Sequence, residues 1–499
     1  MRCVLGSIVT SFFSYRIGIS RLALRFSGVV LLMVMTHPAA HGVVVTTSHK
    51  DKPCVVTDLN FEGSTDLEAM NMQQDTVAAL LKQEKFKELD CLADAARFGR
   101  AKFPGGMWTL HNLYAGLDQP TRQHATEIDW RNHLVRLERW VAARPDSITA
   151  RVALAQSYAG YGWVARGGET SDTVSDSGWK LFRARHAKAK AILDQAAKLR
   201  NKCPEWYVAM QQVALAQEWK QEQAAELFQH AIAFEPGYYY YYRMQANYLL
   251  PKWYGQEGDT EQFASESANR VGGDAGDILY FQIASELVCT CEDPQFRRMS
   301  WPRVQKGYAA LEKQSGQSFL NLNLLALMAV KAEDAELADS TFKRIGDNWH
   351  ENTWRKESYF NRSKKWASEL APNAARLRTF RQEAEANMAT AEGVQYKKDF
   401  EQRLAEPIKH CVQSAASDRK KFELLIEVTK DGAVRDVEMP IQTTVVGCLF
   451  TELLKLQQPD AVRFATPPHA PYWVILEVDP ATVDVAAKPV APQTAVQIP

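Results

Sequence analysis

Few residues in this sequence combine the types and the spacing that catalysis or metal binding needs. Residues 160–165, GYGWVA, match the G-x-G-x-x-A pattern of a dinucleotide-binding turn. They follow a helical stretch, however, whereas that turn follows a strand. Residues 350–354, HENTW, begin like the zinc-protease motif H-E-x-x-H but end in Trp354, where the second histidine ligand would stand. We therefore expect no catalytic residue, no metal ligand and no cofactor.

Residues 166–168, which directly follow GYGWVA, form a loop that could bind an anion. Arg166 is followed by Gly167 and Gly168, and such a loop can present backbone N–H groups beside a guanidinium. A structural turn between two helices is an equal alternative. If the chain is instead an enzyme, we expect its site in an aromatic groove near Trp163, Arg166 and Trp253.

Five consecutive tyrosines, Tyr238 to Tyr242, are the most unusual feature of the chain. Each residue advances about 100° around a helix, so these rings point to all sides. Tyr238 and Tyr242 share one side, and Tyr241 lies on another. Two interpretations stay open. The rings line a concave groove and bind a partner, or they pack inside a thick helical layer.

Apolar residues recur at helical spacing through the first 400 residues, and strand-like alternation is almost absent before residue 420. One helix should stop before Pro145, and Ser147 can cap the next. Alanine and phenylalanine recur in the order of the second helix of a tetratricopeptide repeat: Ala224, Phe228, Ala231 and Pro236, and again Ala338, Phe342 and Ile345. We predict a tetratricopeptide-like helical repeat domain over residues 54–365; a non-repeating helical bundle is the alternative.

Residues 80–290 resemble a bacterial family known as domain of unknown function 4034. The resemblance is carried by the stretch 103–117 (FPGGMWTLHNLYAGL), the stretch 158–193, the tyrosine run with LLPKWYG, and Cys203-Pro204-x-Trp206-Tyr207. It implies a helical, repeat-like fold and no established activity.

The last hundred residues differ from the rest. After a polar, alanine-rich stretch (366–404) that we expect to be a helical linker, the order is helix, strand, turn, strand, helix, strand, with Asp431-Gly432 at the turn. Residues 405–480 thereby resemble the C-terminal domain of TonB-type energy transducers, in its cysteine-bearing variant. That resemblance implies a small α+β domain with a bridge between Cys411 and Cys448. Residues 481–499 should be a disordered tail.

The N-terminus indicates export. Four arginines and no acidic residue precede a short apolar stretch and the small residues Ala39 and Ala40, which is typical of a secretory signal peptide over residues 1–40. We expect a periplasmic protein; anchoring in the inner membrane by an uncleaved segment is the alternative.

Export permits disulfides. Cys411 and Cys448 are alone in the last hundred residues and are natural partners. Cys289 and Cys291 have no second Cys or His pair at zinc-finger spacing, so a disulfide or buried thiols are favoured over a metal site. The pairing stays open for Cys54, Cys91, Cys203, Cys289 and Cys291.

Composition limits the function. The chain has 59 basic and 59 acidic residues, and it lacks the basic footprint of a nucleic-acid binder. We predict a non-enzymatic interaction protein of the bacterial envelope. Its helical groove would bind a peptide, protein or envelope component, with membrane contact only through the signal segment or envelope partners. Its C-terminal domain would bind a second partner. The candidate binding residues are Tyr238, Tyr241, Tyr242, Trp163, Arg166, Gly167, Gly168 and Trp253.

Overall fold

A computed structural model of the chain describes residues 61–483, apart from 62, 122–123, 169, 290–291, 415–420, 439–443, 459–460 and 462. The expected signal peptide, Cys54 and all but the start of the expected tail lie outside these residues. The chain divides into two compact units, Met1–Lys365 and Trp366–Pro499, called here the helical unit and the C-terminal unit. As predicted, the described part is mainly helical with a small antiparallel sheet near the C-terminus.

The helical unit begins with α2 (Asp66–Lys82), α3 (Phe86–Gly99), the 3-10 turn η1 (Pro104–Gly106), α4 (Thr109–Ala115) and α5 (Glu127–Ala143). Pairs of helices that pack against one another follow: α6 (Ile148–Arg166) with α7 (Asp176–Ala196), α8 (Pro204–Ala216) with α9 (Gln221–Phe234), α10 (Tyr240–Tyr248) with α11 (Asp259–Val271), α12 (Gly273–Cys289) with α14 (Trp301–Ser315), and α15 (Phe319–Lys331) with α16 (Ala335–Ile345). The shorter elements are η2 (Ser171–Thr173), α13 (Asp293–Phe296) and α17 (Glu351–Trp354).

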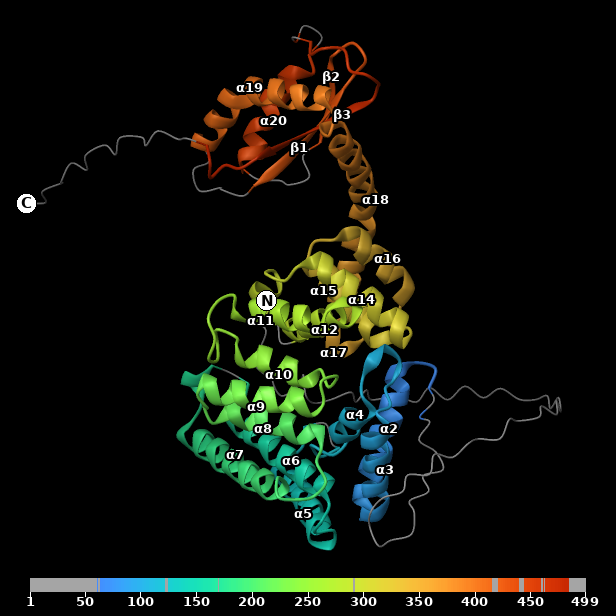
Figure 1. The fold of residues 1–499 in the computed structure, drawn as a ribbon, viewed down its shortest axis with the longest axis vertical. Helices are drawn as coiled ribbons and strands as arrows, with labels where there is room; N and C mark the ends of the chain where they lie inside the picture. The colour runs from blue at the N-terminus through green and yellow to red at the C-terminus, as the bar shows by residue number, and fades with distance from the viewer. Residues whose placement is uncertain are drawn as a thin grey trace, which may run out of the picture. The chain divides into compact units, whose positions relative to one another are not determined.

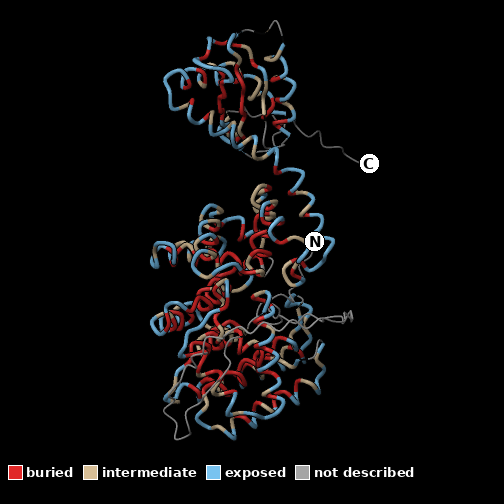
Figure 2. The backbone as a smooth tube through the Cα atoms, turned by 90° about the vertical axis from the view of Figure 1, so that its right-hand side faces the viewer, coloured by how far each residue is buried: buried red, intermediate tan, exposed pale blue. Residues whose placement is uncertain are grey.

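The pairs stack into an array because their first helices also touch: α6 contacts α8, α8 contacts α10, α10 contacts α12, and α12 contacts α15 (Figure 1). The alanine and phenylalanine spacing seen in the sequence falls on second helices. Ala224 and Phe228 are buried in α9, and Ala338 and Phe342 are buried in α16. A small side chain lets neighbouring helices approach closely, and the aromatic ring fills the gap beside it. Buried residues therefore run through the interior of the layers (Figure 2).

Local signals set the helix ends. Helix α5 ends at Ala143, before Pro145, because the residue preceding a proline is disfavoured in the helical conformation. The hydroxyl of Ser147 then accepts a hydrogen bond from the N–H of Ala150 at 3.0 Å and caps α6. Both predicted boundaries are confirmed.

The segment 66–117, called here the N-terminal cover, packs across the array, mainly on the first helices of its pairs. Helix α4 contacts α8, α2 contacts α15, and η1 contacts α14. The Asp66 carboxylate accepts hydrogen bonds from the Ser318 hydroxyl (2.5 Å) and the Phe319 N–H (2.7 Å) at the start of α15. An apolar cluster completes the contact: Leu67, Ala69, Met70, Phe103, Leu320 and Leu324. The cover and the array thus share one core.

The C-terminal unit contains β1 (Phe422–Val428), β2 (Val434–Glu438) and β3 (Tyr472–Val478) in the order β2-β1-β3, all antiparallel. Helix α19 (Ala391–Ser414) precedes β1, and α20 (Thr444–Leu456) lies between β2 and β3. The hairpin turns at Asp431-Gly432, where Gly432 has φ 76°, a conformation that glycine adopts without strain. The predicted order of elements is confirmed.

Helices cover both faces of the sheet. Alternate strand residues such as Leu424 and Val474 pack with α19 and α20, and the intervening ones, such as Leu425 and Ile475, pack with the second half of α18 (Glu357–Met388). A helical linker is expected over residues 366–404. These residues form the second part of α18 and the first part of α19. They contribute to both apolar clusters through Phe380, Ala384, Tyr396, Phe400 and Leu404.

Candidate functional site

A buried carboxylate, Glu205, forms the centre of a polar cluster between the N-terminal cover and the array. It lies at the start of α8 and is fully buried. His111 Nδ1 donates to its Oε1 at 2.6 Å, the Tyr238 hydroxyl donates to the same oxygen, and Gln156 Nε2 donates to Oε2 at 2.9 Å. Helices α4, α6 and α8 and the start of the tyrosine run supply these groups. Burying a charge is expensive, but three donors offset much of that cost.

The tyrosine hydroxyl in this cluster stays protonated. Burial first, and then the negative charge of Glu205, hold the pKa of Tyr238 well above its usual value. Tyr238 therefore acts as a hydrogen-bond donor across the whole ordinary pH range.

His111 is the partly exposed member of the cluster. Its ring stacks on Tyr240, with 3.6 Å between ring centroids, and 18% of its side chain is exposed. Since a carboxylate only accepts, Nδ1 carries the proton. None of the described residues hydrogen-bonds Nε2 of His111. A ring fixed in this way leaves a nitrogen that can act as a base or as a ligand.

The five tyrosine rings are all buried, at 9% exposure or less. Trp108 of the N-terminal cover lies against Tyr238, with ring centroids 5.0 Å apart, and the backbone N–H of Trp108 donates to the Tyr240 hydroxyl at 3.3 Å. Tyr241 and Tyr242 pack inside the array, beside Tyr207 and Phe228 respectively. The rings therefore do not line an open groove. The expectation of a binding surface at Tyr238, Tyr241 and Tyr242 gives way to the packing alternative, because Trp108 of the N-terminal cover packs on Tyr238 and helices of the array pack on Tyr241 and Tyr242.

Trp163, Arg166 and Trp253 do come together, at a separate place. The Trp163 and Trp253 rings lie 5.9 Å apart, and the Arg166 guanidinium lies 5.7 Å from the Trp163 ring. Partial burial lowers the pKa of Arg166. Trp163 is buried with Phe182 and Tyr248 in one apolar cluster, so this group is a packed corner in which Arg166 lies over aromatic faces.

The two glycines after Arg166 end a helix. Gly167 has φ 77° and its N–H donates to the Trp163 carbonyl at 2.9 Å, which caps α6. That N–H is therefore not free to bind an anion, and the structural turn fits Gly167 better than the anion loop. Gly168 follows in the connecting loop and is half-buried.

Sequence reasoning missed the residues that converge on Tyr238. His111 lies within the stretch 103–117, and Glu205 stands between Pro204 and Trp206, so both lie in segments that carry the family resemblance. The unusual residues beside His111 and Glu205 marked these segments as distinctive, but nothing in the sequence singled out His111 or Glu205 themselves. Gln156 has no local signal, because it occupies an ordinary helical position in α6.

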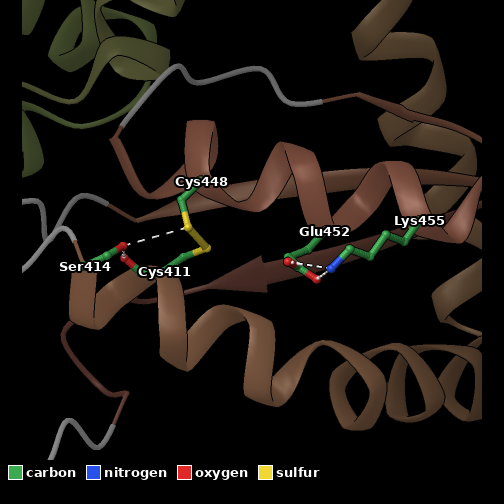
Figure 3. The surroundings of a disulfide bond; sticks show 5 residues. All are labelled: Cys411, Ser414, Cys448, Glu452 and Lys455. Atoms are coloured by element: carbon green, nitrogen blue, oxygen red, sulfur yellow. Dashed lines mark hydrogen bonds and ion pairs between the residues drawn. A yellow bond between two sulfur atoms is a disulfide. The ribbon is translucent and has the colours of Figure 1, made fainter.

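The pairing of Cys411 with Cys448 is confirmed. The two sulfur atoms are bonded, the Cα atoms are 5.5 Å apart, and the bridge joins α19 to α20 (Figure 3). Cys91 is also disulfide-bonded, whereas Cys203 is a buried free thiol whose sulfur lies 3.4 Å from the Tyr114 hydroxyl.

Comparison with protein-family models, with curated proteins and with solved structures finds no match for this chain. In the described residues, no helix combines the length and the apolarity needed to cross a membrane. The same residues contain no group of three or more His, Cys, Asp or Glu side chains arranged to hold a metal ion.

Proposed function

We propose that this chain is an exported, non-enzymatic interaction protein of the bacterial envelope. Its helical unit would be a tetratricopeptide-like scaffold of the kind found in domain of unknown function 4034. Its C-terminal unit, similar to the TonB C-terminal domain, would bind a protein or peptide partner.

A recurring turn supports the repeat. Glu84, Glu218 and Glu333 each join two packed helices and have φ between 55° and 59°. In each case the N–H of the next residue donates to the carbonyl five residues before it, at 2.9–3.0 Å. Non-glycine residues seldom adopt this conformation. Its recurrence in helix pairs α2–α3, α8–α9 and α15–α16 is typical of a repeated unit.

The open side of strand β3 carries the proposal of partner binding. In the order β2-β1-β3, β3 pairs with β1 alone among the described strands. Helices cover both faces of the sheet, so a partner can reach the strands only at an edge. Unpaired backbone N–H and C=O groups at such an edge accept an additional strand. We therefore infer that an extended segment of a partner adds to β3.

Photocrosslinking tests this proposal. A photoreactive phenylalanine replaces Glu477, the exposed side chain of β3, and in a matched variant it replaces Lys398, which is exposed on α19. In intact cells, we expect a discrete adduct with an envelope protein from position 477 and none from 398. Equal adducts from both positions, or none from 477, would contradict binding at this edge.

The His111–Glu205 pair favours a second candidate, an envelope enzyme with His111 as general base. Nδ1 is fixed by a buried carboxylate, and Nε2 has no partner among the described residues. The test compares hydrolysis of a panel of esters, peptides and glycosides by the wild-type protein and by His111→Gln. Turnover that is lost in a stably folded variant would support this candidate, and an absence of turnover in the wild-type protein would eliminate it.

A further inference from the structure

A cavity of about 250 Å³ lies in the helical unit between α13, the start of α14 and the end of α15. Its inner wall is apolar, formed by Phe296, Met299 and Val304, which are all buried, and by the ring of Trp301. Pockets that enclose drug-sized ligands measure about 300–1,000 Å³. This cavity is smaller, so it suits a single large side chain rather than a peptide.

The wall is fixed before any ligand arrives. The Phe296 and Trp301 rings meet edge to face, with 6.3 Å between centroids. Trp301 Nε1 donates to Asp334 at 2.9 Å, and Gln305 Nε2 donates to the same carboxylate oxygen at 2.8 Å. Because these side chains are already fixed by their contacts with one another, ligand binding would cost little side-chain conformational entropy at the aromatic wall.

Two opposite charges stand at the mouth of the cavity. Arg297 and Glu333 both line it and are both exposed. Within the part of the chain that the structure describes, neither side chain has an ion-pair or hydrogen-bond partner, and the two do not pair with each other. A third charge, Lys331, lines the cavity too and donates to Asp293 at 2.5 Å; an ammonium has further donors to offer.

We propose that this cavity binds a free α-amino acid with a large apolar side chain, in its zwitterionic form. The side chain enters the apolar pocket against Phe296 and Trp301. The α-carboxylate meets the Arg297 guanidinium, with the spare donors of Lys331 beside it, and the α-ammonium meets Glu333. An end of a polypeptide would supply only one of the two charges and would leave the other rim residue without a partner.

The ligand series that tests the proposal is L-phenylalanine, N-acetyl-L-phenylalanine, which lacks the ammonium, and L-phenylalanine amide, which lacks the carboxylate. Affinities for the full chain are measured by saturation-transfer NMR. We expect the free amino acid to bind about tenfold or more tightly than either derivative, because each derivative loses one charge-assisted contact. A six-residue peptide ending in phenylalanine should bind no better than the N-acetyl derivative.

Two variants test which rim residue contacts which charged group of the ligand. Arg297→Gln should weaken binding of L-phenylalanine about tenfold and abolish its advantage over the amide, since the carboxylate contact is gone. Glu333→Gln should weaken it similarly and abolish the advantage over the N-acetyl derivative. Glu218→Gln is the matched control, because Glu218 occupies the same turn position after α8 with φ 55°; it should bind like the wild-type protein.

Several results would overturn the proposal: no binding of L-phenylalanine by the wild-type protein, equal binding of all three compounds, or unchanged selectivity in both variants. Tighter binding of the N-acetyl derivative or of the peptide would also overturn it, and would assign the cavity to a chain terminus. Thermal unfolding of each variant checks that the fold is retained, as both substituted side chains are exposed.

Discussion

Glu205 shows how a single buried charge ties two parts of the helical unit together. Its oxygens join His111 of the N-terminal cover to Gln156 of α6 and to Tyr238. Removing a carboxylate from such a site leaves its donors buried without an acceptor, and the loss exceeds that of one neutral hydrogen bond.

We predict a graded series of stabilities around this residue. Glu205→Ala should lower the free energy of unfolding by about 3–5 kcal/mol, because His111, Gln156 and Tyr238 all lose their acceptor. Tyr238→Phe should cost about 1–3 kcal/mol. Tyr242→Phe is the control and should change little, since the ring packs on Phe228 and its hydroxyl has no hydrogen bond to any residue that the structure describes. Urea unfolding measures the order, and equal losses in all three variants would contradict it.

A second residue-scale prediction concerns pH. His186 in α7 is fully buried beside Trp163 and Phe182, and burial lowers its pKa to about 4. The unfolded value is about 6.5, so the stability that neutral His186 contributes is complete above pH 6.5 and is lost as the pH falls toward 4.

Substitution of His186 by Gln should therefore reduce the loss of stability between pH 7 and pH 4 by about 2–3 kcal/mol. His230→Gln is the control, because His230 is exposed on α9, and it should keep the wild-type dependence. Urea unfolding at both pH values tests this. The same pH dependence in wild-type protein and His186→Gln would show that His186 is not responsible.

At the scale of elements, the turn η1 attaches the N-terminal cover to α15. Gly105 has φ 79°, and a Cβ added there would lie 2.3 Å from the Ser318 Cβ. Gly316 has nearly the same φ, 77°, but a Cβ there meets nothing within 4 Å. Both substitutions force an alanine into the left-handed conformation, which costs about 1–2 kcal/mol of folding free energy. Gly105→Ala should therefore be more destabilising than Gly316→Ala, because only Gly105→Ala also creates a steric clash.

The comparison of these two variants isolates the contact between η1 and α15. We expect Gly105→Ala to be the less stable variant by at least about 1–3 kcal/mol and to be cleaved sooner by a protease within residues 61–117. Similar thermal unfolding temperatures for the two variants would contradict a close contact here.

Elements with local signals were predictable from the sequence, and the long-range contact was not. Ser147 marked the start of α6, the Ala–Phe spacing marked α9 and α16, and Asp431-Gly432 marked the hairpin, because caps, periodicity and turn residues act within a few positions. The contact of Asp66 with Ser318 spans 252 positions. No periodicity within either segment encodes it, so the burial of Tyr238 and Tyr240 beneath the cover could not be deduced from their helical phase alone.

At the scale of the whole molecule, the expectation of export depends on residues 1–40, which lie outside the described residues. If residues 1–40 are a cleaved signal peptide, N-terminal sequencing of protein from a periplasmic extract should begin near residues 41–43. Because disulfides persist in that compartment, the same preparation should yield a non-reduced peptide that links Cys411 to Cys448. An intact Met1 on cytosolic protein, with both cysteines reduced, would contradict export.

The contact between Asp66 and Ser318 also affects how the helical unit assembles. In a linear stack of repeats each unit touches only its neighbours, so folding can begin anywhere and the ends can fray. Here the first helix of the described chain completes its contacts only after α15 has been synthesised. The relative contact order is thus raised, which slows folding, and neither end of the array can open without disrupting the other. The helical unit should therefore melt as one cooperative body, and no truncation that removes α15 should leave a stable remainder.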